Sequence, residues 1–183
     1  MTEKQKMLAG LLYFSEEDEL LKERQEAKQL CFELNNLPPQ ETKTKEEILK
    51  KLLKHKGQGV TVELTFRCDY GYNISIGDDT FINYNCTVLD CCEVTIGKNV
   101  LIGPNCGIYA ATHPTDKKLR LDKQEFAKPV TICDNVWIGG SAVILAGVTI
   151  GQNSVIGAGS VVTKDIPPDS IAVGNPCKVI KKI

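Results

Sequence analysis

The sequence TICDNVWIGGSAVILAGVTIGQNSVIGAGSVVTK, residues 131–164, carries an aliphatic residue at every sixth position. The residues in this register are Ile132, Ile138, Ile144, Ile150, Ile156 and Val162. An amphipathic helix needs apolar residues at a spacing near 3.6 and a half-buried strand needs alternation, so a period of six fits neither. Each unit is therefore one short strand with a turn, and three units make one triangular coil of a stacked solenoid.

The same register occurs earlier in two shorter runs. These runs consist of Ile76, Ile82 and Val88, and of Ile96, Ile102 and Ile108. The step from the first run to the second is eight residues long, so one corner must hold two extra residues. The longest interruption spans about 109–129 and contains Thr112, His113 and Pro114. We expect about five coils and, at this interruption, an extruded loop with a function, because long loops without one are uncommon in compact domains.

The N-terminal third of the chain has helical rather than sixfold periodicity. We expect one helix over 15–37, with Ser15 as its cap, and a second over 44–56 that ends at Gly57. The sequence therefore predicts a mainly β protein. An N-terminal helical segment, 1–58, precedes a β-helix domain, 59–183, which carries the loop at about 109–129 and a short C-terminal tail.

Composition and charge limit the classes of partner. The 183 residues carry a formal net charge of −1, which gives no reason to expect nucleic acid or an acidic membrane. The start of the chain is polar, and no apolar run approaches the roughly 20 residues of a membrane span. We expect a cytoplasmic enzyme or binding protein.

Eight cysteines raise the question of a metal or disulfide framework. Cys86, Cys92 and Cys106 occupy repeat positions that are elsewhere filled by Val, Ala or Ser, where a thiol acts as a small apolar group. Cys91 and Cys92 are neighbours that would face opposite sides of a strand. No pair has C-x-x-C spacing, so we expect neither a zinc site nor a disulfide framework. The remaining four cysteines, Cys31, Cys68, Cys133 and Cys177, have no assigned role.

His113 is the strongest candidate for catalysis, because it lies in the one large break of a regular scaffold and directly before Pro114. A neutral imidazole can take the proton from a hydroxyl that attacks a carbonyl. Asn83 follows a repeat position, where its amide either stabilises an oxyanion or suits a tight corner. The lysines of the C-terminal tail either bind phosphate groups or favour solubility.

Other reaction classes lack their motifs. No glycine loop of the Walker or dinucleotide type follows a strand and opens a helix, and no Gly-x-Ser-x-Gly sequence occurs. A γ-type carbonic anhydrase has similar coils but needs three zinc-binding histidines, whereas His113 is the only histidine in the coil region. We therefore expect no metal.

Five segments together resemble the hexapeptide-repeat acyltransferases, specifically the sugar O-acetyltransferase group that contains the maltose and galactoside acetyltransferases. The segments are Met7-Leu8-Ala9-Gly10, Cys68-Asp69-Tyr70-Gly71-Tyr72-Asn73-Ile74, Ala111-Thr112-His113-Pro114, Asn135-Val136-Trp137-Ile138-Gly139-Gly140, and residues 157–168. The resemblance covers nearly the whole chain. It implies a left-handed parallel β-helix that assembles as a homotrimer, with active sites between subunits and acetyl-CoA as the co-substrate.

The resemblance also implies roles for single residues. His113 would be the general base for direct attack of a sugar hydroxyl on the thioester, Asn83 would hold the acceptor or the developing oxyanion, and Asp69 would contact the sugar. The residues that match the acetyl-CoA positions are Trp137, Gly140, Ala158, Thr163, Lys164, Lys178 and Lys181.

The chain departs from its relatives at two acceptor positions. Phe14-Ser15 stands where relatives often carry an aspartate after the first tyrosine, and Cys91 takes an acidic position. The expected acceptor is a sugar of the maltose, glucose or galactoside type. The alternative is a non-catalytic or differently specific trimeric β-helix binding protein.

Overall fold

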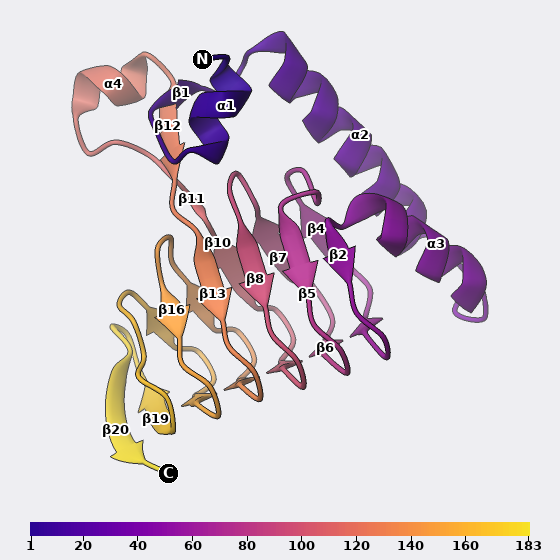
Figure 1. Ribbon diagram of the computed structural model, residues 1–183, viewed down its shortest axis with the longest axis vertical. Coiled ribbons are helices and arrows are strands. Elements are labelled where there is room, and N and C mark those ends of the chain that lie inside the picture. The colour runs from indigo at the N-terminus through magenta and orange to yellow at the C-terminus, as the bar shows by residue number, and fades with distance from the viewer.

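The coils dominate the computed structural model, which describes residues 1–183 (Figure 1). From His55 to Val162 the chain winds through five complete coils, each with one short strand on each of three faces. Within each face the strands of successive coils pair in parallel and in register. The predicted left-handed β-helix and its coil number are therefore confirmed.

The three faces follow one another in chain order. Face 1 contains β2 (His55–Lys56), β5 (Ile74–Ile76), β8 (Val94–Ile96), β13 (Val130–Ile132) and β16 (Thr149–Ile150). Face 2 contains β3 (Thr61–Val62), β6 (Phe81–Ile82), β9 (Leu101–Ile102), β14 (Trp137–Ile138), β17 (Val155–Ile156) and β19 (Ser170–Val173), with β20 (Lys178–Lys182) antiparallel at its end. Face 3 contains β4 (Phe66–Cys68), β7 (Cys86–Leu89), β10 (Gly107–Tyr109), β15 (Val143–Ile144) and β18 (Val161–Val162).

The sixfold register is the inner wall of this column. Ile132, Ile138 and Ile144 are each fully buried, one on each face of a single coil. Burial of such a side chain contributes about 1.5–3 kcal/mol relative to leaving it exposed. Because every coil repeats these positions, the coils share one continuous core, which also takes in the buried thiols of Cys86 and Cys106.

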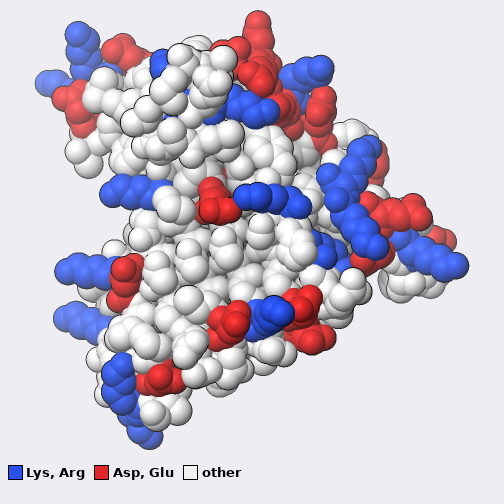
Figure 2. Space-filling view, in the orientation of Figure 1, with Lys and Arg blue, Asp and Glu red and all other residues white.

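The outward side chains give the faces different chemistry. Face 1 presents Ser75, Thr95, Thr131 and Thr149 in one row. Figure 2 shows charged side chains along the two borders of this face and none between them. Face 2 instead presents the apolar row Phe81, Leu101, Trp137, Val155 and Ile171. Leu101 and Trp137 are about half exposed in the single chain, so face 2 is the apolar surface that an assembly could cover.

Three helices precede the coils: α1 (Glu3–Leu8), α2 (Asp18–Asn35) and α3 (Thr42–Leu52). The sequence did not predict α1. The prediction that Ser15 caps α2 is wrong, because the Glu17 carboxylate accepts the amides of Glu19 and Leu20. The buried side of α2 consists of Leu20, Ala27, Cys31 and Leu34, and the helix packs on β4.

The second predicted helix is displaced in the structure. It starts at Thr42 and stops at Leu52, not at Lys56. His55 and Lys56 form β2 instead and pair with β5, and the amide of Gly57 donates to the carbonyl of Ile76. Pairing with the next coil therefore outweighs the local helical preference, and the coils begin a few residues before residue 59.

The extruded segment is an ordered arm. It contains β11 (Ala111–Thr112), α4 (Lys117–Leu121) and β12 (Gln124–Ala127), and β12 pairs antiparallel with both β11 and β1 (Tyr13–Phe14). Figure 1 shows the arm beside α1, where the N-terminus of the chain lies. The arm is thus held by the N-terminal segment. None of the helices is long and apolar enough to cross a membrane.

The corner between faces 3 and 1 holds the insertions of the early coils. Asp69–Asn73, Asp90–Glu93 and the arm all leave the column there. Cys91 and Cys92 lie in the second of these turns and both are buried, so the expectation that they face opposite sides of a strand is wrong. Within the turn, the Asp90 carboxylate accepts the amides of Asp69, Tyr70 and Asn73 and so ties two insertions together.

Asp90 predicts a pH dependence of stability. Burial raises its pKa to about 7, although the backbone amides that it accepts act in the other direction. Between about pH 4 and pH 7 the folded chain then holds a proton that the unfolded chain has lost, so the free energy of unfolding falls as pH rises through this window. Chemical denaturation should show that the wild type loses about 2 kcal/mol more than Asp90→Asn between pH 5 and pH 7.5. Parallel pH profiles for the two proteins would contradict this assignment.

Candidate active site

The insertions at the corner between faces 3 and 1 surround a cavity of about 380 Å³. This size lies within the usual range of small-molecule sites. Its lining residues are Ser15, Glu16, Leu21, Arg24, Asp69, Leu89, Cys91, Ala111, His113 and Glu125. The structure therefore brings together two of the predicted site residues, His113 and Asp69, although they are 44 positions apart in the sequence.

His113 lies between β11 and α4, with its side chain exposed. The Arg120 guanidinium donates to the carbonyls of Pro114 and Thr115 at 2.9 and 3.0 Å. Asp116 caps α4 by accepting the amides of Lys118 and Leu119. These hydrogen bonds therefore fix the backbone from Pro114 to the start of α4, which directly follows His113.

Asp69 is held in the wall of the cavity. Burial raises the pKa of its carboxyl, while the Cys91 thiol, which donates to Oδ2 at 3.5 Å, and the Arg24 guanidinium lower it. Its backbone amide donates to Asp90. A partly desolvated carboxylate of this kind is a strong hydrogen-bond acceptor for hydroxyl groups.

Two residues of this cavity were missed by the sequence analysis. Arg24, on α2, donates to the Tyr70 hydroxyl and to the Ser15 carbonyl, both at 2.6 Å. Glu125, on β12, accepts the Tyr13 hydroxyl at 2.9 Å. Each stands among other charged residues in a segment without a motif, so only the packing of α2 and β1 against the coils shows that it reaches the cavity. Ser15 and Cys91, which stand at the two positions where the sequence is expected to depart from the family, both line the same cavity.

Asn83 lies on a different edge of the column. It follows β6 at the corner between faces 2 and 3, and its Oδ1 accepts the amide of Tyr84 at 2.8 Å. Its Nδ2 makes no hydrogen bond within the chain. Gly140 and Ala158 occupy equivalent corners in later coils, and a Cβ on Gly139 would lie only 2.5 Å from the Ala158 amide. The corners of successive coils therefore stack closely into one ridge, on which Asn83, Gly140 and Ala158 all lie.

Face 3 separates this ridge from His113. Strand β7 starts after the Asn83 corner and ends at the Asp90 turn, and its four residues span about 13 Å. A single chain therefore does not bring Asn83 to His113. It carries the two predicted catalytic residues on opposite edges of the same face.

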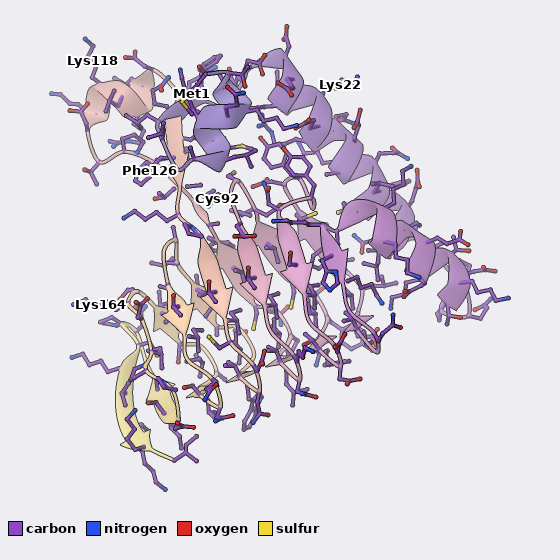
Figure 3. The ribbon with its side chains drawn as sticks, viewed as in Figure 1. Met1, Lys22, Cys92, Lys118, Phe126 and Lys164 are labelled. Carbon is purple, nitrogen blue, oxygen red and sulfur yellow. The ribbon has the colours of Figure 1, made fainter.

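The expected cofactor residues lie on face 2 and on the same two edges. Trp137 and Lys181 lie in one outward row of face 2, Gly140 and Ala158 lie on the adjacent ridge, and Lys178 pairs with Val173 at the end of that ridge. Thr163 and Lys164 follow β18 at the corner below the arm. Figure 3 shows Lys164 on the left border of the column, below the arm that carries Phe126 and Lys118.

Comparison with known proteins gives matches along the whole chain. The model of the maltose acetyltransferase hexapeptide capping motif matches residues 6–57, the bacterial transferase hexapeptide (six repeats) matches 129–164, and the hexapeptide repeat of succinyl-transferase matches 93–112. A putative acetyltransferase of Saccharomyces cerevisiae is 49% identical over 178 residues, which are 97% of this chain and 91% of that protein.

Solved structures agree with these matches. A maltose O-acetyltransferase from Clostridium difficile 630 has a TM-score of 0.99 and 53% identity, covering 100% of this chain and 98% of that chain. A galactoside acetyltransferase in complex with coenzyme A has a TM-score of 0.96 and 41% identity, covering 100% and 92%. With the N-terminal capping segment, the coils and the arm all shared, the chain belongs to the hexapeptide-repeat acetyltransferases of the maltose and galactoside acetyltransferase type.

Proposed function

We propose that this protein transfers the acetyl group of acetyl-CoA to a hydroxyl of a sugar of the maltose, glucose or galactoside type. The observation that carries the proposal is the cavity at the corner between faces 3 and 1. The exposed imidazole of His113 lines this cavity together with the carboxylates of Asp69 and Glu125 and the guanidinium of Arg24. Such a set of donors and acceptors suits a polyhydroxylated molecule. We infer acetyl-CoA as the acetyl donor from membership of the family, since the related galactoside acetyltransferase was solved with coenzyme A.

His113 acts as the general base in this proposal. Its imidazole takes the proton of the acceptor hydroxyl while the hydroxyl oxygen attacks the thioester carbonyl. The tetrahedral oxyanion then collapses, the carbon–sulfur bond breaks, and the CoA thiolate leaves with the proton that His113 returns. Asp69 binds a neighbouring hydroxyl of the sugar, and Asn83 supplies an amide donor to the oxyanion or the acceptor.

Acetyl-CoA fits the ridge and the apolar row of face 2. The pantetheine arm has apolar and amide segments, which match the exposed ring of Trp137 and the backbone at Gly140 and Ala158. The phosphate groups would meet Lys178 and Lys181 on β20, whose side chains are exposed. Thr163 and Lys164 would contribute from the other edge.

Because the two edges of one chain lie apart, the proposed reaction requires that subunits assemble. His113 and Asn83 act on the same acceptor only if the ridge of one subunit lies against the arm of the next. Three subunits around a threefold axis satisfy this with identical contacts, and they also cover the apolar row of face 2. We therefore propose a homotrimer with three active sites, each between two subunits.

The first prediction from this proposed function concerns His113. We expect His113→Ala to lower the acceptor-dependent release of CoA by about 100- to 10,000-fold, because the variant lacks the base. Acetyl-CoA at 100 times its dissociation constant should still stabilise the variant by about 2.7 kcal/mol, because the cofactor contacts are intact. CoA release is followed with a thiol reagent over glucosides, galactosides, maltose and free sugars, and the protein's own eight thiols are subtracted.

His55→Ala is the matched control, since His55 is the other histidine and lies exposed on β2. Unchanged turnover in His113→Ala would exclude this residue as the base. Stabilisation by acetyl-CoA without release to any sugar would place the acceptor outside the sugars. Absence of both would favour the non-catalytic binding protein.

The second prediction concerns face 2. Leu101→Lys should convert the trimer to monomers and abolish turnover, because a buried unpaired lysine costs about 3 kcal/mol or more. Light scattering after size-exclusion chromatography measures the mass. Thr95→Lys, in the same coil on face 1, should leave both mass and turnover unchanged. A trimeric Leu101→Lys would show that face 2 is not the interface.

A further inference from the structure

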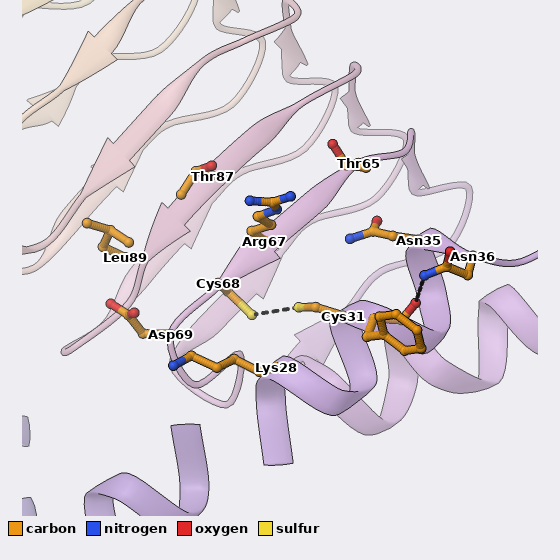
Figure 4. Close-up of a pocket in the computed structure, with 11 residues that line it drawn as sticks. Lys28, Cys31, Asn35, Asn36, Thr65, Arg67, Cys68, Asp69, Thr87 and Leu89 are labelled. Atoms are coloured by element: carbon orange, nitrogen blue, oxygen red, sulfur yellow. Dashed lines mark hydrogen bonds between the residues drawn. The ribbon is translucent and has the colours of Figure 1, made fainter. Parts of the chain in front are cut away.

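A second cavity of about 540 Å³ lies between α2 and face 3 and shares Asp69 and Leu89 with the wall of the cavity that contains His113 (Figure 4). Its lining residues are Lys28, Cys31, Phe32, Asn35, Asn36, Thr65, Arg67, Cys68, Asp69, Thr87 and Leu89. Figure 4 shows Cys31 on the helix and Cys68 on the strand pointing toward each other across the gap between these elements. The cavity therefore opens onto a pair of thiols from two different elements.

The two sulfur atoms lie 3.7 Å apart. A disulfide has an S–S bond of about 2.05 Å, so the atoms need to approach by about 1.7 Å. Cys31 is 6% exposed and Cys68 is 8% exposed, so both are largely shielded from bulk solvent, and both residues line the cavity.

The environment makes the two thiols unequal. The hydrogen bond with Cys68 lowers the pKa of Cys31, against the effect of burial, and the nearby Arg67 guanidinium lowers it further. The same hydrogen bond and burial raise the pKa of Cys68. Cys31 is thus the better nucleophile, and Cys68 remains a thiol beside it.

We propose that Cys31 and Cys68 form a redox-active dithiol site that takes hydrogen peroxide as its oxidant. The Cys31 thiolate attacks one peroxide oxygen, the O–O bond breaks, and water leaves with a proton from solution. The resulting sulfenic acid is attacked by the sulfur of Cys68, which forms the S–S bond and releases a second water. Two thiols lose two electrons in total, and one peroxide becomes two waters.

The bond would fasten α2 to the first coil. The cysteines are 37 positions apart, and Cys68 directly precedes Asp69 in the wall of the cavity that contains His113. Oxidation at this site therefore restrains the helix that supplies Arg24 and the turn that supplies Asp69.

The chain provides an internal comparison for this pair. Cys86 and Cys106 are also buried neighbours, but their thiols donate to the carbonyls of Gly103 and Gly139 within the core of the coils. Neither of them lines the cavity of Cys31 and Cys68. Cys133 and Cys177 are more exposed, yet neither has a thiol partner.

The experiment treats the reduced full-length protein with hydrogen peroxide and counts thiols after denaturation. We expect the count to fall from eight to six, the mass to fall by about 2 Da, and a digest without reductant to contain the Cys31 and Cys68 peptides joined. Cys68→Ser should give no joined peptide and should retain a sulfenic acid at Cys31 that dimedone labels. Cys177→Ser, the control, should behave as the wild type with one thiol fewer.

Two results would overturn the proposal. One is oxidation confined to Cys133 and Cys177 with the Cys31 and Cys68 peptides still reduced. The other is a Cys68→Ser variant in which Cys31 gains no dimedone label although the wild type loses two thiols.

Discussion

The stacking of one coil on the next in strict register is the constraint on which the rest of this protein depends. Each aliphatic residue of the sixfold repeat lies above its equivalent in the previous coil, as Ile150 does above Ile132 and Ile132 above Ile96. Because the inner positions are fixed, the corners are fixed as well. Residues that are far apart in the sequence then form columns along each edge, and function is determined by what each corner carries.

In the proposed reaction two corners carry the chemistry, and they differ in structure. The corner between faces 2 and 3 is tight and repeats nearly unchanged, so it forms a smooth ridge with the amide of Asn83 and the small residues Gly140 and Ala158. The corner between faces 3 and 1 accepts insertions, and α2 and β1 close over it to form the cavity at His113. One face of the column holds these edges apart, which makes a second subunit a chemical requirement of the proposed reaction and not an accessory to it.

Much of this architecture could be predicted from the sequence, because a sixfold period over 34 residues has few structural solutions. The position of His113 followed from the same regularity, since the arm is where the repeat stops. Arg24 and Glu125 could not be found this way, because their place in the site depends on how α2 and β1 pack on the coils. Likewise, the early end of α3 depends on the pairing of β2 with β5, which cannot be predicted from the local sequence pattern.

The most direct test of this account mixes two inactive variants. His113→Ala and Asn83→Ala should each turn over poorly alone, and refolding or coexpressing them in equal amounts should restore about one quarter of the wild-type rate, because one interface in four then joins an intact His113 to an intact Asn83. Native mass spectrometry confirms that mixed trimers have formed. No recovery of activity in mixed trimers would contradict the claim that each active site combines the arm of one subunit with the ridge of its neighbour.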